Sequence, residues 1–182
     1  MPNQPKKIVI IGPESTGKST LSAALAAHFG EPWVEEYARK YIQQLDRDYH
    51  FDDLLEIAKG QIQLEDVMAK QAEALLFCDT DLHVIHVWSE HKYQKTADWI
   101  LEQMARRKYD LYLLTDIDIP WEEDPLREHP DPEMRTFFYH WYDRLMHTAD
   151  APVVAISGSL DERLTKSIKA IEDYLGKTAG NQ

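Results

Sequence analysis

Gly12-Pro13-Glu14-Ser15-Thr16-Gly17-Lys18-Ser19 is the stretch that decides the fold of this chain. It matches the complete pattern G-x-x-x-x-G-K-[ST], in which a glycine-rich loop wraps around phosphate groups. The pattern requires a strand before the loop and a helix after it. Residues 7–12 form a β-branched run typical of a buried strand, and residues 17–29 have the apolar spacing of a helix. With both neighbours present, a chance match in an ordinary turn is strongly disfavoured.

Each part of this loop has a defined role in holding a nucleoside triphosphate. The glycines let backbone N–H groups approach the β- and γ-phosphates, and the helix N-terminus adds the positive end of its dipole. The Lys18 ammonium pairs with the β/γ oxygens, and the Ser19 hydroxyl is expected to coordinate Mg²⁺. The sequence therefore predicts ATP and Mg²⁺ as cofactors. The expected ATP-binding residues are Gly12, Pro13, Glu14, Ser15, Thr16, Gly17, Lys18, Ser19 and Thr20.

The rest of the chain alternates short β-branched runs with longer helical periods. Further strands are expected at residues 33–37, 75–79, 111–115 and 153–157, and further helices at about residues 52–73, 94–107 and 160–175. Strands separated by helices imply right-handed crossovers and a parallel sheet covered on both faces. Together with the phosphate loop, this order predicts an α/β fold of the three-layer P-loop NTPase type, with a five-stranded parallel sheet and a short lid.

Length and composition fit one domain. At 182 residues the chain can bury one core, so we expect a single domain over residues 1–182, with its core at about 7–175. It contains no apolar run of 18 residues, so no helix is expected to cross a membrane. Cys78 is the only cysteine, which excludes an intrachain disulfide and a cysteine-rich zinc site. These features favour the cytoplasm.

The charge of the chain limits its partners. The net charge of −12 repels phosphate backbones, so extended nucleic-acid binding is not expected without a basic groove. The densest basic group, Arg106-Arg107-Lys108, reads as the charged end of a helix. We therefore expect a small-molecule partner, with neither a nucleic acid nor a membrane. The sequence leaves the oligomeric state open.

Two carboxylates follow the expected strand at residues 75–79. Asp79 closes the apolar run, in the place of a Walker B aspartate that organises Mg²⁺. Asp81 lies two residues further on, at the mouth of the same expected cleft. Asp and Thr also favour helix N-caps, so a purely structural cap is the alternative for both positions. The metal-binding reading is favoured for Asp79, and the two readings are balanced for Asp81.

Polar residues also end the expected strand at 33–37. The sequence Glu35-Glu36-Tyr37-Ala38-Arg39 places carboxylates where they can hold a substrate hydroxyl and accept its proton. The Tyr37 ring can stack on a flat substrate ring. The alternative is an exposed strand end, and spacing alone does not decide between the two.

The segment 116–129 is loop-like because of its proline content. Arg127 is well placed to be a lid arginine that stabilises charge on the transferred phosphoryl group. Trp121 is either a core residue or a stacking surface. Further on, a set of apolar residues follows helical spacing and is expected in the core. The set is Met134, Phe137, Phe138, Trp141 and Leu145.

Four motifs together resemble a known family. They are the loop at residues 12–21, Glu-Glu-Tyr-Ala-Arg-Lys-Tyr at 35–41, Phe-Cys-Asp-Thr-Asp at 77–81 and Asp-Ile-Pro-Trp-Glu-Glu-Asp-Pro-Leu-Arg at 118–127. In this order and spacing they resemble the ribosylnicotinamide kinase domain of the bacterial NadR proteins of NAD biosynthesis. The resemblance covers about residues 7–175. The loop alone is shared by a vast superfamily, whereas the combination is much more specific.

The resemblance implies a reaction and a set of roles. The family transfers the γ-phosphoryl group of ATP to the 5′-hydroxyl of nicotinamide riboside, which gives nicotinamide mononucleotide. It implies that Lys18 and Ser19 serve the phosphates and Mg²⁺, Asp79 the metal and Arg127 the lid. The residues implied around the riboside are Glu36, Tyr37, Arg39, Asp81 and Trp121. The general base stays open between Asp81 and Glu36.

The chain departs from the family in two ways. Full-length members carry a DNA-binding segment and an adenylyltransferase domain before the kinase. Because the first expected strand starts at residue 7, we expect neither here, and no regulatory or NAD-forming activity. Also, Pro125 stands where a glycine is expected after the lid aspartate, and it stiffens the loop. This second departure bears mainly on the choice of substrate.

A different class of function remains open beside the small-molecule kinase. The chain could act as an ATPase or nucleotide-dependent switch through a protein partner, which predicts slow hydrolysis without an acceptor. The absence of a guanine-reading Asn-Lys-x-Asp pattern argues against a GTPase. Within the kinase class, another nucleoside or small alcohol is an alternative acceptor.

Overall fold

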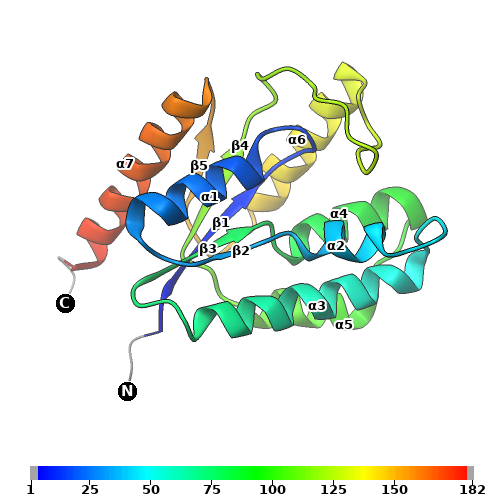
Figure 1. The fold of residues 1–182 in the computed structure, drawn as a ribbon, viewed down its shortest axis with the longest axis horizontal. Coiled ribbons are helices and arrows are strands. Elements are labelled where there is room, and N and C mark those ends of the chain that lie inside the picture. Colours follow the sequence, from blue (N-terminus) through cyan, green and yellow to red (C-terminus); the bar gives the residue numbers. More distant parts are fainter. Residues whose placement is uncertain (1–3, 180–182) are drawn as a thin grey trace.

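The computed structural model describes residues 4–179. Its elements alternate along the chain as expected for an α/β protein (Figure 1). The strands are β1 (Lys6–Ile11), β2 (Trp33–Val34), β3 (Leu75–Asp79), β4 (Leu111–Thr115) and β5 (Val153–Ile156). The helices are α1 (Lys18–Phe29), α2 (Tyr37–Gln43), α3 (Phe51–Ala69), α4 (Leu82–Tyr93), α5 (Asp98–Arg106), α6 (Pro132–Met146) and α7 (Leu160–Ala179).

The strands form one parallel sheet in the order β2-β3-β1-β4-β5. The predicted five-stranded parallel sheet is therefore confirmed. After β1 the chain crosses to the edge strand β2, returns to β3 beside β1, and then continues to β4 and β5 on the other side of β1. The strand order thus reverses beside β1, and in such sheets ligands bind beyond the carboxyl ends of the strands at this point. The phosphate loop follows β1 directly.

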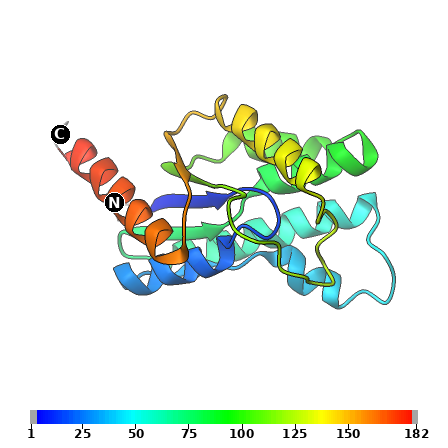
Figure 2. The same ribbon diagram turned by 90° about the horizontal axis from the view of Figure 1, so that it is seen from above.

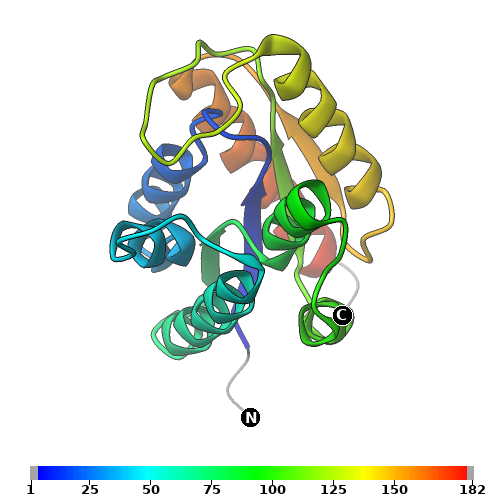
Figure 3. The same ribbon diagram turned by 90° about the vertical axis from the view of Figure 1, so that its right-hand side faces the viewer.

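Successive side chains of β1 point to opposite faces of the sheet, and helices cover both faces, which gives three layers. Ile8 and Ile10 point to the face covered by α1 and α7, where they meet Leu21 and Ile171. The intervening Val9 and Ile11 point to the opposite face. That face packs against apolar residues of α3, α4 and α6, and Figure 3 shows the helices on both sides of the sheet. Because both faces are buried, the strands are continuous apolar runs.

The structure differs from the predictions at four places. The expected strand at 33–37 ends at Val34, and Tyr37 instead begins α2. The expected helix at 94–107 was wrong at its start, because Gln94 has φ 55° and ends α4, while α5 begins at Asp98. Residues such as His83 and His91 were expected to be helical, but no helix with bounds was predicted for α4, since its buried positions lie on more than one side and give no simple amphipathic pattern. In α6, Phe137 is 44% exposed, so its predicted place in the core was wrong.

The segment 116–131, between β4 and α6, contains no helix or strand. It arches over the phosphate loop, as Figure 2 shows from above. It is therefore the lid that the sequence predicts. Within residues 4–179, no helix combines the length and the apolar character that a membrane span needs.

Candidate active site

A cavity of about 390 Å³ lies at the carboxyl end of the sheet, between the phosphate loop and the lid. Its floor is the loop and the first turn of α1, and its far wall comes from β2–α2, α4 and α6. The lining residues used below are Gly12, Glu14, Ser15, Lys18, Ser19, Glu36, Arg39, Trp88, Arg127, Tyr142 and Arg163. Three of the four sequence motifs, those at residues 12–21, 35–41 and 118–127, thus contribute residues to one cavity.

The phosphate loop is held in shape by its glycines and by β4. Gly12 has φ 147°, and a Cβ atom there would lie 2.5 Å from Thr115 Oγ1. The Thr16 hydroxyl donates to Pro13 O at 2.8 Å and lies 2.7 Å from Thr115 Oγ1. Gly17 has φ 74° and is the N-cap of α1. Only glycine adopts such angles without strain, so the loop presents its backbone to the cavity.

The positive charge of Lys18 lies near several carboxylates. Its ammonium group donates to Pro13 O at 2.6 Å. Burial lowers the pKa of Lys18, while the charges of Glu36, Asp79 and Glu14 act in the opposite direction. A cation held among carboxylates at the N-terminus of a helix suits the phosphates of a nucleotide.

Ser19 and Asp79 meet at the predicted metal site. Asp79 ends β3 beside Ile10 of β1 and is 1% exposed. Burial raises the pKa of its carboxyl, and a hydrogen bond with the Ser19 side chain opposes that change. The Asp79 Oδ1 atom is buried and has no hydrogen-bond partner. A hydroxyl beside an unsatisfied carboxylate oxygen is a donor set that suits Mg²⁺, whose other ligands in such sites are phosphates and water.

Among residues 4–179, no group of three His, Cys, Asp or Glu side chains is arranged to hold a metal ion. The side chains of Ser19 and Asp79 are hydrogen-bonded to each other, and their role as metal ligands stays a prediction.

Glu36 enters the cavity from the junction of β2 and α2. Burial and, to a smaller extent, the nearby charge of Asp79 raise the pKa of its carboxyl to about 6, against the opposing charges of Lys18 and Arg39. The Gln61 amide holds the backbone on both sides of Glu36. It accepts from Tyr37 N at 2.8 Å and donates to Glu35 O at 3.3 Å. The sequence analysis did not identify Gln61, because a lone glutamine within a helix carries no pattern.

Asp81 does not take the place predicted for it. It is the N-cap of α4, accepting from His83 N at 2.9 Å. Its Oδ2 atom lies 2.7 Å from His83 Nδ1 and accepts from the Tyr112 hydroxyl at 3.1 Å. It is 1% exposed and is not among the described residues that line the cavity. The structural-cap alternative therefore describes Asp81, since its carboxylate is already occupied by protein donors.

The two aromatic candidates also lie outside the lining of the cavity. The Tyr37 ring packs on α3, where a Cβ atom on Gly60 would come within 2.1 Å of it. Trp121 lies between two guanidinium groups, 5.9 Å from Arg127 and 5.8 Å from Arg135. Its indole N–H is buried without a hydrogen-bond partner. Neither ring is placed to stack on a ligand in this arrangement.

Comparisons with known proteins agree with this site. A family model described as an AAA domain matches residues 7–163, which include the phosphate loop and most of the cavity. The chain belongs to this AAA domain family. Two curated relatives, the trifunctional NAD biosynthesis/regulator proteins NadR of Escherichia coli K12 and Salmonella typhimurium LT2, are each 25% identical over 94% of the chain. The chain spans 43% of the length of each relative, and the resemblance to NadR is confirmed.

Solved structures show the same relationship. A crystal structure of NadR with NR and another with NAD and AMP-PNP each superpose with a TM-score of 0.75 at 26% identity, over 94% of this chain and 50% of theirs. A deoxyadenosine kinase from M. mycoides has a TM-score of 0.64 at 15% identity, over 92% of this chain and 99% of its own. The fold of this AAA domain is therefore that of P-loop kinases.

The lid of this AAA domain is fastened on two sides. Arg39 on α2 forms an ion pair with Asp124 at 2.9 Å. On the other side, Glu14 Oε2 accepts from the backbone of residues 128 and 129 at 3.0 and 3.1 Å. Arg127 donates to Ser15 Oγ at 3.2 Å, beside the phosphate loop. Arg39 and Arg127 thus both line the cavity, as predicted.

Two aromatic residues that the sequence analysis did not assign to the site line the cavity instead. Trp88 comes from α4 and Tyr142 from α6. Because α4 was missed as an element, Trp88 had no predicted location. Tyr142 lies on the inward face of α6, where it is 2% exposed. The apolar wall of the cavity is therefore built by helices that follow β3 and β4.

Proposed function

We propose that this AAA domain is an ATP-dependent kinase that phosphorylates the hydroxyl of a small nucleoside-like acceptor. The most specific form of the proposal is transfer to the 5′-hydroxyl of nicotinamide riboside, which gives nicotinamide mononucleotide. The observation that carries it is that Glu36 shares one cavity with Lys18 and the phosphate loop. The similarity to NadR, including a NadR structure with NR, supports the choice of acceptor.

The phosphate loop supplies the ATP side of the proposed reaction. Backbone N–H groups of residues 12–20 and the Lys18 ammonium hold the β- and γ-phosphates. Ser19 and Asp79 would hold Mg²⁺, which offsets charge on the transferred phosphoryl group. Arg127 belongs to the lid and contacts Ser15 of the phosphate loop. It would stabilise the charge on the transferred phosphoryl group. These residues act by positioning and by charge, and they form no bond to the phosphoryl group.

Glu36 supplies the acceptor side. We assign it as the general base, since its carboxylate lines the cavity whereas that of Asp81 is occupied as a helix cap. With a pKa of about 6 it is ionised near neutral pH and remains basic enough to accept the hydroxyl proton. Arg39 would bind acceptor oxygens, and Trp88 with Tyr142 would face its flat ring.

The test is ADP release from Mg-ATP by the purified protein, with nicotinamide riboside and with a panel of ordinary nucleosides. Release that depends on nicotinamide riboside and disappears in Lys18→Ala is the expected result. Release with another nucleoside only would keep the kinase and change its acceptor. Slow hydrolysis that no acceptor increases would overturn the kinase proposal in favour of a nucleotide-dependent switch.

A further inference from the structure

A buried arginine outside the sequence motifs, at the edge of the cavity, binds the phosphate loop. Arg163, in the first turn of α7, is 2% exposed. Its guanidinium donates to Gly158 O at 2.7 Å, to Asp116 O at 3.0 Å and to Thr16 O at 3.1 Å. It also forms an ion pair with Asp118. One side chain therefore joins the phosphate loop, the start of the lid and the β5–α7 turn.

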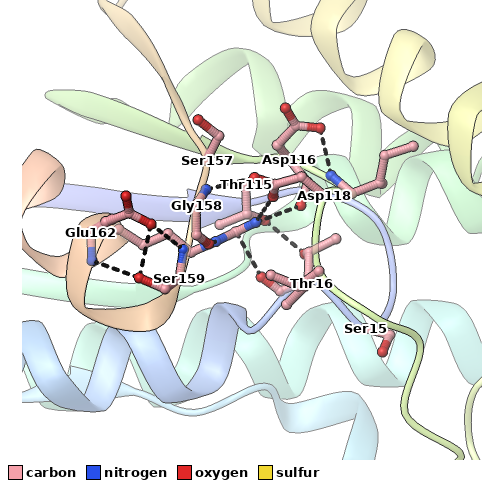
Figure 4. Close-up of polar contacts among 12 residues, drawn as sticks. Ser15, Thr16, Thr115, Asp116, Asp118, Ser157, Gly158, Ser159 and Glu162 are labelled. Atoms are coloured by element: carbon pink, nitrogen blue, oxygen red, sulfur yellow. Dashed lines mark hydrogen bonds and ion pairs between the residues drawn. The ribbon is translucent and has the colours of Figure 1, made fainter.

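Asp118 completes this connection. Its Oδ2 atom accepts from Gly158 N at 2.6 Å, while Oδ1 pairs with Arg163. Figure 4 shows Thr16, Asp116, Asp118 and Gly158 gathered around one point, although they come from three separate segments. The cluster is hydrogen-bonded throughout, so the buried charge of Arg163 is compensated.

The bond to Thr16 has a geometric consequence. In a trans peptide the C=O and the following N–H point in opposite directions within one plane. When Arg163 holds the Thr16 carbonyl, the Gly17 N–H is turned away from the guanidinium. Arg135 holds the preceding peptide, Ser15–Thr16, in the same way. It donates to Ser15 O at 3.2 Å and also to Ile119 O at 3.1 Å. Two consecutive peptides of the loop are thus oriented from outside.

We propose that Arg163 is a positioning residue for nucleotide binding, which acts by fixing the Thr16–Gly17 peptide and is itself held by Asp118. Gly17 has φ 74° and no Cβ atom, so no side chain restricts this peptide on its Gly17 side. Without an external partner the peptide can turn, and its N–H no longer meets the phosphate. The inference rests on the proposed function only in requiring that the loop bind a nucleotide.

The experiment compares Arg163→Lys with Arg107→Lys in the full chain. Lysine keeps the charge but cannot bond three carbonyls in the fixed geometry of a guanidinium. Arg107 is a matched control, since it is 13% exposed and paired with Glu65 and Asp66. Titration calorimetry measures the Kd of ADP, thermal unfolding reports folding, and steady-state kinetics separate kcat from each KM.

We expect Arg163→Lys to weaken ADP binding by about tenfold or more and to raise the KM of ATP, because an oriented backbone donor is lost. The KM of the acceptor should stay unchanged. Arg107→Lys should lower the melting temperature alone. An ADP affinity within about twofold of wild type, in a folded Arg163→Lys protein, overturns the inference.

Asp118→Asn provides a second test that does not depend on the folding of Arg163→Lys. It keeps the guanidinium and removes its ion pair, so a smaller loss of ADP affinity is expected. Unchanged affinity in that folded variant also overturns the inference. Failure of wild-type protein to bind ADP would overturn the proposed function itself, whereas an acceptor other than nicotinamide riboside would leave this inference intact.

Discussion

The two sides of the cavity are built in different ways. The phosphate side consists of consecutive residues, 12–20, whose backbone is shaped by glycines and held from behind by β4. The acceptor side consists of single side chains from α2, α4, α6 and the lid, with Glu36 and Trp88 among them. The phosphate loop is formed by one continuous stretch of sequence. The acceptor side is formed by side chains from separate helices, which come together only when those helices pack.

This difference has a consequence for mutation. The transferred phosphoryl group carries a large negative charge in the transition state. Loss of a single side chain that stabilises this charge should therefore lower the rate severely. On the acceptor side several side chains share the contact, so effects should be graded.

Lys18→Ala should give the largest effect. It removes an ammonium group that lies near the charges of Glu36, Asp79 and Glu14, and kcat should fall by roughly 10³-fold or more. Steady-state ADP release measures this. Lys59→Ala, at an exposed position of α3 that pairs with Glu56, is the control and should retain wild-type turnover. If the kcat of Lys18→Ala is within tenfold of the wild-type value, the proposed difference between the phosphate side and the acceptor side is wrong.

Glu36→Gln tests the base and should lower kcat by roughly 10²-fold or more. The pH profile gives a sharper readout. A base must be ionised, so kcat/KM of wild type should rise with pH through about 6 and level off above it. This limb should be absent in Glu36→Gln.

Glu35→Gln is the matched control for Glu36. The neighbouring Glu35 is exposed and pairs with Lys40, so its loss should leave both the rate and the acidic limb in place. An acidic limb that persists in Glu36→Gln would transfer the role of base to another group.

The sequence was sufficient for the phosphate side because its structure depends on local chemistry. The loop pattern, the strand before it and the helix after it all agree with the structure. Ser19 and Asp79 were also placed together, since a parallel sheet brings the ends of neighbouring strands to one edge. The five parallel strands followed from apolar runs that are continuous in the sequence.

The acceptor side was predicted less well for a physical reason. Asp81, Tyr37 and Trp121 were grouped by their distance from strand ends, but each is occupied by tertiary partners: Tyr112, Gly60 and Arg135. Trp88 was missed with α4, whose apolar residues face several neighbours. Which way a side chain points after a strand ends depends on packing, and a single sequence does not encode that in any local pattern.

Gly12→Ala tests whether the cradle depends on its backbone. A Cβ atom at this position meets Thr115 Oγ1 at 2.5 Å and Thr115 O at 2.8 Å, and φ is 147°. The loop must shift, so the KM of ATP should rise by about tenfold while the KM of the acceptor changes little. Gly176→Ala in α7 is the control, because no atom lies within 4 Å of its Cβ position. Equal changes in both KM values would mean that the two sides are not separable.

Asp124→Asn should give the smallest effect and lies on the acceptor side. It removes the ion pair with Arg39, in which the side chains are 21% and 39% exposed. Partly exposed pairs of this kind contribute up to about 1 kcal/mol, so the KM of the acceptor should rise by no more than about fivefold. The KM of ATP should stay constant, because Glu14 still fastens the other end of the lid. A loss of kcat as large as that of Glu36→Gln would show instead that closure of the lid, and not a shared wall of side chains, controls the acceptor side.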